Sequence, residues 1–302
     1  MTKRNVAIYL AAIAMLLVAV STWYAFSFSS EKTTPSDFDG ERALADVVSQ
    51  VSFGPRIPGT EGHARFQDWL STRLKTGGWT VEIQYSVQDG HPIENVLAKR
   101  GSDSPEVILG AHYDSRIYAD NDPDPRMRQQ PVPGAEDGAS GVAVLLELAR
   151  SLPSDIPPVW LVFFDAEDNG RIGDWDWILG SRAFVAQNPV TPQAVVILDM
   201  VGDADLNIYY EMNSDSSLRS EIWQVAEEQG FGRFFIPQVK YSMLDDHTPF
   251  LEAGLHAVDI IDFDYPYFHT TQDTPDKISA ESLNAVGATL RAWIMERNHQ
   301  RK

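Results

Sequence analysis

Hydrophobic residues along the chain occur either as short uninterrupted runs or at helical spacing. Uninterrupted runs are typical of strands buried on both faces of a sheet, and they lie at 107–111, 159–164, 194–198 and 257–261. Apolar positions three and four residues apart predict amphipathic helices over 39–51, 61–75, 142–152, 181–187, 218–229 and 279–296. This alternation predicts an α/β fold, a three-layer α/β/α sandwich around a mostly parallel mixed sheet.

Other segments alternate apolar and polar positions, as half-buried strands do. Segment 79–87 is predicted to be a strand with 95–99 as its neighbour, and 206–211 is expected to be an edge strand. Segment 115–134 is rich in Pro, Asp and Arg and predicts a long surface loop. A second predicted loop carries Trp175 and Trp177.

The N-terminal segment is predicted to lie outside this fold. Lys3 and Arg4 precede residues 6–28, which carry no charge and are about long enough to cross a bilayer, where roughly 20 residues are needed. We expect residues 1–28 to be a membrane anchor, with the folded body on the extracytoplasmic side. Secretion after signal cleavage is the alternative. Residues 29–38 are predicted to be a polar linker, and 39–302 to be one domain.

Composition and net charge exclude several classes of function and of reactive site. The formal net charge of −19 argues against nucleic-acid binding, which needs a basic surface, and it suits a cationic substrate group such as a free amine. The chain has no cysteine, so disulfides, thiolate metal ligands and a cysteine nucleophile are excluded. The sequence also lacks a Gly-x-Ser-x-Gly motif and a phosphate-binding loop.

Candidate metal ligands follow the predicted buried strands or lie in the loops beside them. They are His112, Asp114, Asp137, Glu167, Asp168, Asp199 and His269. Because ligands of open α/β sheets bind outside the carboxyl ends of the strands, we expect these side chains to converge. Two imidazoles with several carboxylates suit zinc, whereas magnesium and calcium prefer oxygen ligands alone. Each residue also has an ordinary interpretation, such as a helix cap or a turn former.

The motifs around these residues resemble those of the exported zinc aminopeptidases, in the same order. That superfamily includes the animal-type glutaminyl cyclases and their bacterial relatives, and the resemblance covers about residues 40–295. The motifs are His112-x-Asp114, Gly134-Ala-x-Asp137-x-Ala-Ser-Gly141, Glu167-Asp168, Leu198-Asp199-Met-Val-Gly202, Asp246-His247-x-Pro249-Phe250 and His269-Thr-x-x-Asp273-Thr.

The aminopeptidase pattern implies two zinc ions. One would be bound by His112, Asp137 and Asp199, and the other by Asp137, Asp168 and His269, so that Asp137 would bridge them. This pattern also implies that Glu167 acts as the general base toward a water held between the metals.

Other features resemble the bacterial cyclase-like proteins. They are the doubled acid in Asp245-Asp246-His247, the Leu179-Gly180-Ser181-Arg182 segment and the sequence of 133–150. In that group a single zinc occupies the positions matching Asp137, Asp168 and His269, and the equivalents of Asp199 and Asp245 form a hydrogen-bonded chain.

Under the cyclase pattern the catalytic residues are Glu167, Asp199 and Asp245, and His112 is structural. Trp175, Tyr265 and Phe268 would form the apolar substrate pocket. Two residues depart from the pattern. Asp168 stands where many members have Glu, and Phe268 stands where the cyclases usually have Trp.

These resemblances imply a zinc-dependent catalytic domain over 39–302 that acts on peptide or protein N-termini. We expect a glutaminyl-peptide cyclotransferase-like activity, which converts N-terminal Gln to pyroglutamate and releases ammonia. The alternative is a di-zinc aminopeptidase that hydrolyses N-terminal residues. A metal-free binding domain on the same fold is a third possibility, but such a relative should have lost ligands, and this sequence retains all of them.

Overall fold

The computed structural model describes residues 37–300 of the protein. The predicted membrane anchor and most of the predicted linker lie outside the described residues and stay predictions. Within 37–300, no helix combines the length and the apolar character needed to cross a membrane.

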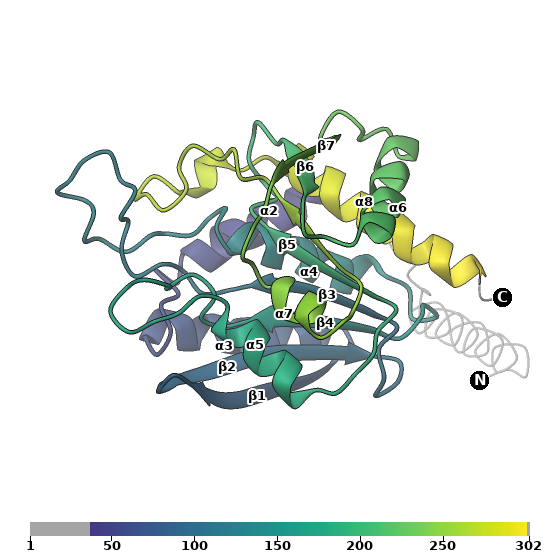
Figure 1. The fold of residues 1–302 in the computed structure, drawn as a ribbon, viewed down its shortest axis with the longest axis horizontal. Coiled ribbons are helices and arrows are strands. Elements are labelled where there is room, and N and C mark those ends of the chain that lie inside the picture. The colour runs from purple at the N-terminus through teal and green to yellow at the C-terminus, as the bar shows by residue number, and fades with distance from the viewer. Residues whose placement is uncertain (1–36, 301–302) are drawn as a thin grey trace, which may run out of the picture. The chain divides into compact units, whose positions relative to one another are not determined.

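The core of the fold is a six-stranded mixed sheet with the order β1-β2-β4-β3-β5-β8 (Figure 1). β4, β3, β5 and β8 run parallel to one another, whereas β2 pairs antiparallel with both β1 and β4. The strands are β1 (Thr80–Gln88), β2 (His91–Arg100), β3 (Val107–His112), β4 (Val159–Phe164), β5 (Ala194–Asp199) and β8 (Ala257–Ile261).

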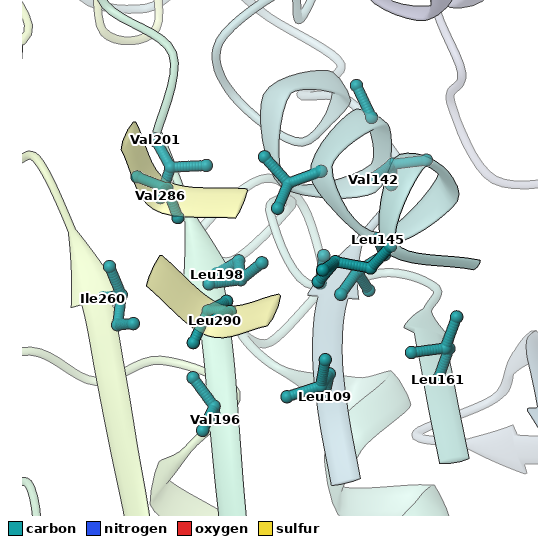
Figure 2. Packing of buried hydrophobic residues seen from close by; sticks show 14 of the residues in the cluster. Leu109, Val142, Leu145, Leu161, Val196, Leu198, Val201, Ile260, Val286 and Leu290 are labelled. Carbon is teal, nitrogen blue, oxygen red and sulfur yellow. The ribbon is translucent and has the colours of Figure 1, made fainter. Parts of the chain in front are cut away.

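The uninterrupted apolar strands separate two hydrophobic cores. In β3 and β5, Leu109 and Val196 face the first core, whereas Ile108 and Ile197 face the second. The first core lies under α2 (Gly40–Val51), α3 (Glu61–Thr76), α4 (Ala139–Ser151), α6 (Ser216–Glu228) and α8 (Ala280–Gln300), and Figure 2 shows Leu109 and Val196 beneath α4 and α8. The second core contains residues of α5 (Leu179–Gln187) and α7 (Thr248–Glu252). The predicted α/β sandwich around a mixed sheet is therefore confirmed.

Local chemistry explains where helices begin and how closely they pack. The Asp39 carboxylate caps α2 by accepting a hydrogen bond from the Arg42 N–H at 3.0 Å, and the Thr60 side chain caps α3 in the same way. Gly141 in α4 lets that helix approach β5 closely, because a Cβ there would lie 2.4 Å from the Leu198 carbonyl oxygen.

The edge strand predicted within 206–211 is present, but it does not belong to the main sheet. Segment 206–211 contributes β6 (Ile208–Glu211), which lies outside the main sheet and pairs parallel with β7 (Phe235–Tyr241) in a separate two-stranded sheet. The strand β7 was not predicted, because it contains Pro237 and four exposed residues and therefore lacks an apolar pattern.

The parallel strands determine where the site forms. β3, β4 and β5 are adjacent and parallel, so their carboxyl ends meet at one edge of the sheet. His112 and Asp199 are the last residues of β3 and β5, and Glu167 and Asp168 follow β4 by a few residues. The predicted ligands therefore converge as expected from this topology.

Candidate metal centre

Asp137, Asp168 and His269 form one buried cluster at this edge. The Nε2 of His269 lies 2.8 Å from Asp168 Oδ1 and 3.6 Å from Asp137 Oδ2. One possible ligand atom from each of the three residues lies within 4.8 Å of the others. This spacing matches three ligands around one ion.

His112, Asp137 and Asp199 form a second buried cluster that shares Asp137. The Nε2 of His112 lies 3.1 Å from Asp137 Oδ1 and 3.2 Å from Asp199 Oδ1. The two carboxylate oxygens of Asp137 therefore face different imidazoles, His112 on one side and His269 on the other. This geometry allows Asp137 to bridge two ions.

Two buried carboxylates keep the ligands in place. Asp114 accepts hydrogen bonds from the backbone N–H groups of Glu167 at 3.0 Å and Asp168 at 3.3 Å, and from Asn169 Nδ2 at 3.0 Å. Asp114 Oδ1 also lies 3.4 Å from His112 Nδ1. Asp114 thus contacts both clusters, one through the Asp168 backbone and the other through the Nδ1 of His112.

Asp273 plays the corresponding part for Asp137. Its carboxylate accepts the backbone N–H groups of Glu136 at 2.8 Å and Asp137 at 3.2 Å. Tyr265 donates its hydroxyl to Asp273 Oδ1 at 2.8 Å. Tyr265, predicted to line the substrate pocket, therefore lies buried behind the ligands, and its ring does not line the cavity described below.

Electrostatics favour a cation between these groups. Burial and the neighbouring Asp137 carboxylate raise the pKa of Asp168 to about 6, and burial with Asp245 raises the pKa of Asp199 to about 7. Among the described residues, Asp137 Oδ2 and Asp168 Oδ2 are buried without a hydrogen-bond partner. Imidazole and carboxylate donors suit zinc, so the residues present fit this metal.

A cavity of about 370 Å³ opens over the clusters. Asp137, Glu167, Asp168, Asp199 and His269 are among its lining residues. Burial, together with nearby carboxylates that include Asp168, raises the pKa of Glu167 well above its ordinary value, although the His112 charge opposes this shift. A carboxyl group whose pKa is raised in this way is suited to accept and return a proton.

The apolar lining of the cavity differs from the prediction in two residues, Trp175 and the buried Tyr265 described above. Phe268 lines it as expected, and its ring stacks on His269 with the centroids 3.6 Å apart. Trp175 lies instead in a neighbouring cavity of about 290 Å³, stacked on His91 at 3.6 Å. Its neighbour in the same loop, Trp177, occupies the expected place.

Trp177 is held there by a glycine and a cation. A Cβ on Gly170 would lie 2.2–2.4 Å from atoms of the indole, so only glycine leaves room for this ring. The Arg116 guanidinium lies 4.9 Å from the Trp177 ring centre, and the ring runs nearly parallel to the His269 imidazole, with centroids 6.3 Å apart. Neither Trp177 nor Arg116 was predicted to belong to the site, although Arg116 lies only two residues after the His112-x-Asp114 motif.

Asp245 also lines the cavity, and it lies in front of a further buried group. Asp245, His247 and Asp259 could together hold an ion. The His247 Nε2 lies 3.3 Å from Glu211 Oε2, and its Nδ1 lies 3.6 Å from Asp259 Oδ2. Carboxylates therefore continue from Asp199 into the protein behind the cavity.

The backbone is strained at three points of the site. Ala166, Met200 and His269 have φ values of +53°, +46° and +56°, a region that residues other than glycine adopt rarely. Ala166 precedes Glu167, Met200 follows Asp199, and His269 is a candidate ligand itself. Such conformations persist where the surrounding contacts enforce them, and they are frequent at active sites.

Comparisons with known proteins agree with this geometry. The solved structure of Porphyromonas gingivalis glutaminyl cyclase is 35% identical, with a TM-score of 0.81, over 87% of this chain and 100% of that one. A Zn-dependent exopeptidase from Parabacteroides distasonis is 33% identical, with a TM-score of 0.81, over 86% of this chain and 99% of its own. Aminopeptidase YwaD of Bacillus subtilis is 27% identical over 88% of this chain, which spans 59% of that relative.

These proteins are cyclases and exopeptidases, so the comparisons support an enzyme and leave its reaction open. The model of Peptidase family M28 matches residues 95–294, which include every candidate ligand and both cyclase-type acids. On these grounds, the chain belongs to Peptidase family M28.

Proposed function

We propose that this protein is a zinc-dependent glutaminyl-peptide cyclotransferase that converts N-terminal glutamine to pyroglutamate and releases ammonia. The observation that carries the proposal is that Asp199 and Asp245 both line the cavity, where burial together with the Asp245 carboxylate raises the pKa of Asp199. Asp245 has no ligand role in a two-zinc pattern, yet its carboxylate lies close enough to influence Asp199. The likeness to a bacterial glutaminyl cyclase over that protein's full length supports the same reaction.

Asp137, Asp168 and His269 would hold the metal. When bound, zinc supplies a Lewis acid that polarises a carbonyl oxygen, here the γ-carboxamide of the substrate. The rest of the chemistry belongs to the side chains around the ligands.

Glu167 would move the proton. The substrate α-amine attacks the γ-carbonyl carbon, so a C–N bond forms while the bond to the amide nitrogen breaks. Glu167 accepts the proton that the amine loses and delivers it to the departing nitrogen, which leaves as ammonia. No water is consumed, so the apolar side chains Trp177, Phe268 and Ile261 serve the reaction by excluding water from the cavity.

Asp199 and Asp245 would orient the substrate. Their carboxyl groups line the cavity with Glu167, where they can accept a hydrogen bond from the substrate's amide nitrogen. The cationic form of an N-terminal amine is also attracted to this acidic cavity, consistent with the net charge of −19.

The test compares two substrates. The purified protein is incubated with a Gln-initiated peptide and with leucine anilide, with and without a zinc chelator. Ammonia release without loss of a residue, abolished by the chelator and restored by zinc, is the expected result. Anilide cleavage without ammonia release would contradict the proposal.

A di-zinc aminopeptidase is the second candidate. It is favoured by the two oxygens of Asp137, which face His112 and His269 separately as a bridging ligand requires. The metal content of the active protein separates the candidates. About one zinc per chain, retained in His112→Asn, fits the cyclase. About two per chain, falling to one in that variant, fits the aminopeptidase.

A further inference from the structure

We infer that Asp120 positions the metal ligand His269, and that Arg116 holds Asp120 in that role. The inference rests on the proposed zinc centre at Asp137, Asp168 and His269. It concerns Arg116 and Asp120, which belong to none of the motifs that carry the resemblance.

The two nitrogens of the His269 ring face different partners. Nε2 lies 2.8 Å from Asp168 Oδ1, on the metal side, and Nδ1 lies 3.6 Å from Asp120 Oδ1, on the opposite side. A histidine that binds metal through one nitrogen commonly donates its other N–H to a carboxylate, which fixes the tautomer and the ring orientation. A ring shift of less than about 1 Å would bring Nδ1 within normal hydrogen-bond distance of Asp120.

Arg116 fixes the position of the Asp120 side chain. The Asp120 side chain is 46% exposed, so burial alone does not orient it, whereas the Arg116 side chain is only 3% exposed. Arg116 Nε and Nη2 donate to the two oxygens of Asp120 at 2.8 and 2.7 Å, which is a bidentate pair. Arg116 Nη1 also donates to the backbone oxygen of Asp168 at 2.7 Å. One guanidinium therefore links Asp120 to a second candidate ligand.

The residues next to Asp120 hold the backbone of the same histidine. Asn121 donates its N–H to the His269 carbonyl oxygen at 3.2 Å. Asp122 Oδ2 accepts hydrogen bonds from the Thr271 N–H at 3.0 Å and the Thr271 hydroxyl at 2.6 Å. These contacts are to the His269 backbone and to Thr271 and fasten the two loops to each other, so they differ from the contact that Asp120 makes with the imidazole.

A purely structural role makes a different prediction. If Asp120 only fastened the loop, then Asp122, which joins the same two loops, would matter equally for the metal. If Asp120 acts through His269, the effect on zinc binding is specific to Asp120. Asp124 provides a further control, because it lies in the same loop and pairs with the exposed Arg126.

The experiment measures the zinc dissociation constant by competition with a chromogenic chelator. We expect Asp120→Ala to weaken zinc binding by roughly 10- to 100-fold, and Asp120→Asn to have a smaller effect because its amide oxygen can still accept the Nδ1–H. Arg116→Lys, which cannot form the bidentate pair with Asp120, should also weaken zinc binding. Asp122→Asn and Asp124→Asn should stay within about threefold of the unsubstituted protein. Urea unfolding of the zinc-free proteins shows that each variant is folded.

A second readout follows the imidazole itself. Nitrogen-15 spectra of the zinc-bound protein should show His269 with its proton on Nδ1, and the Nδ1 signal should move in Asp120→Ala. Equal zinc affinity in Asp120→Ala and the unsubstituted protein, or equal losses in Asp120→Ala and Asp122→Asn, would overturn the inference while leaving the zinc centre intact. An unsubstituted protein that bound no zinc would overturn both.

Discussion

Replacing Asp114 with asparagine tests whether this buried carboxylate organises the site. Three amide donors converge on it, the N–H groups of Glu167 and Asp168 and the Asn169 Nδ2, and His112 Nδ1 lies 3.4 Å from its Oδ1. Oδ2 accepts two of these bonds and Oδ1 accepts the third. An asparagine can keep its oxygen at the Oδ2 position, but its NH₂ group then faces the Glu167 N–H, so one buried donor loses its acceptor.

The expected cost follows from that single loss. A hydrogen bond to a charged group contributes about 1.5–3 kcal/mol, and an unsatisfied buried donor costs about 1–3 kcal/mol, two figures that partly overlap. We expect Asp114→Asn to lower the free energy of unfolding by about 2–4 kcal/mol. In a domain of this size that corresponds to roughly 4–16 °C in Tm. Because Asp168 would also lose its alignment, zinc affinity should fall by roughly 10- to 100-fold.

Urea unfolding of the zinc-free protein and chelator competition measure the two effects. Asp103→Asn is the matched control, because Asp103 is exposed in the loop between β2 and β3 and should change the unfolding free energy by less than about 0.5 kcal/mol. If Asp114→Asn were as stable as this control and bound zinc equally well, the assignment of Asp114 as the organiser of residues 167–169 would be refuted.

Three further predictions address the cavity, the pH dependence and the metal. Gly170→Ala should displace Trp177 and raise the KM for a Gln-initiated peptide about tenfold with zinc content unchanged. Gly77→Ala is the control, because a Cβ there would lie 3.4 Å from its nearest neighbour, and it should leave KM unchanged. Equal KM values for the two variants would argue against the role of Trp177. Burial raises the pKa of Asp262 to about 7, so the folded protein holds a proton that the unfolded chain loses near pH 4. The contribution of Asp262 to stability is complete below about pH 4 and is lost as the pH rises to 7, so the free energy of unfolding should fall over this range. Urea titrations should show that Asp262→Asn reduces this fall by up to about 1.4 kcal/mol per pH unit. An unchanged pH dependence in the variant would contradict the raised pKa of Asp262. Removing zinc should lower the unfolding free energy by about 2.7 kcal/mol relative to protein held at a free zinc concentration 100 times Kd, and calorimetry that finds no difference would speak against a resident metal.

Much of the fold follows from the sequence because the central strands are buried on both faces. Ile108 and Leu109 belong to opposite cores, so both must be apolar, and the same holds for Val196 and Ile197. The pattern fails where burial is incomplete. β7 carries Pro237 and mostly exposed residues, and the sequence therefore contains no strand signal there.

The convergence of the candidate ligands was predictable for a related reason. Parallel strands bring their carboxyl ends together, so His112 and Asp199 had to lie near one another. The direction of loop side chains was not predictable. Trp175 and Trp177 are two residues apart, yet they line different cavities, and Trp177 enters the site where Gly170 leaves room for its ring.

The role of Arg116 could not be predicted from the spacing of charges in the sequence. Arg116 and Asp120 are four residues apart with opposite charges, a spacing that usually marks an exposed pair of little consequence. The structure buries the arginine against the Asp168 backbone, which no local pattern of charges indicates.

The central claim is that Glu167 transfers a proton from the substrate amine to departing ammonia. Its most direct test measures ammonia release from a Gln-initiated peptide by the zinc-loaded protein and by Glu167→Gln. We predict that the unsubstituted protein releases one ammonia per peptide without freeing a residue, and that the variant binds zinc normally but turns over about 10²- to 10⁴-fold more slowly. Full activity of the variant, or release of free glutamine in place of ammonia, would contradict the claim.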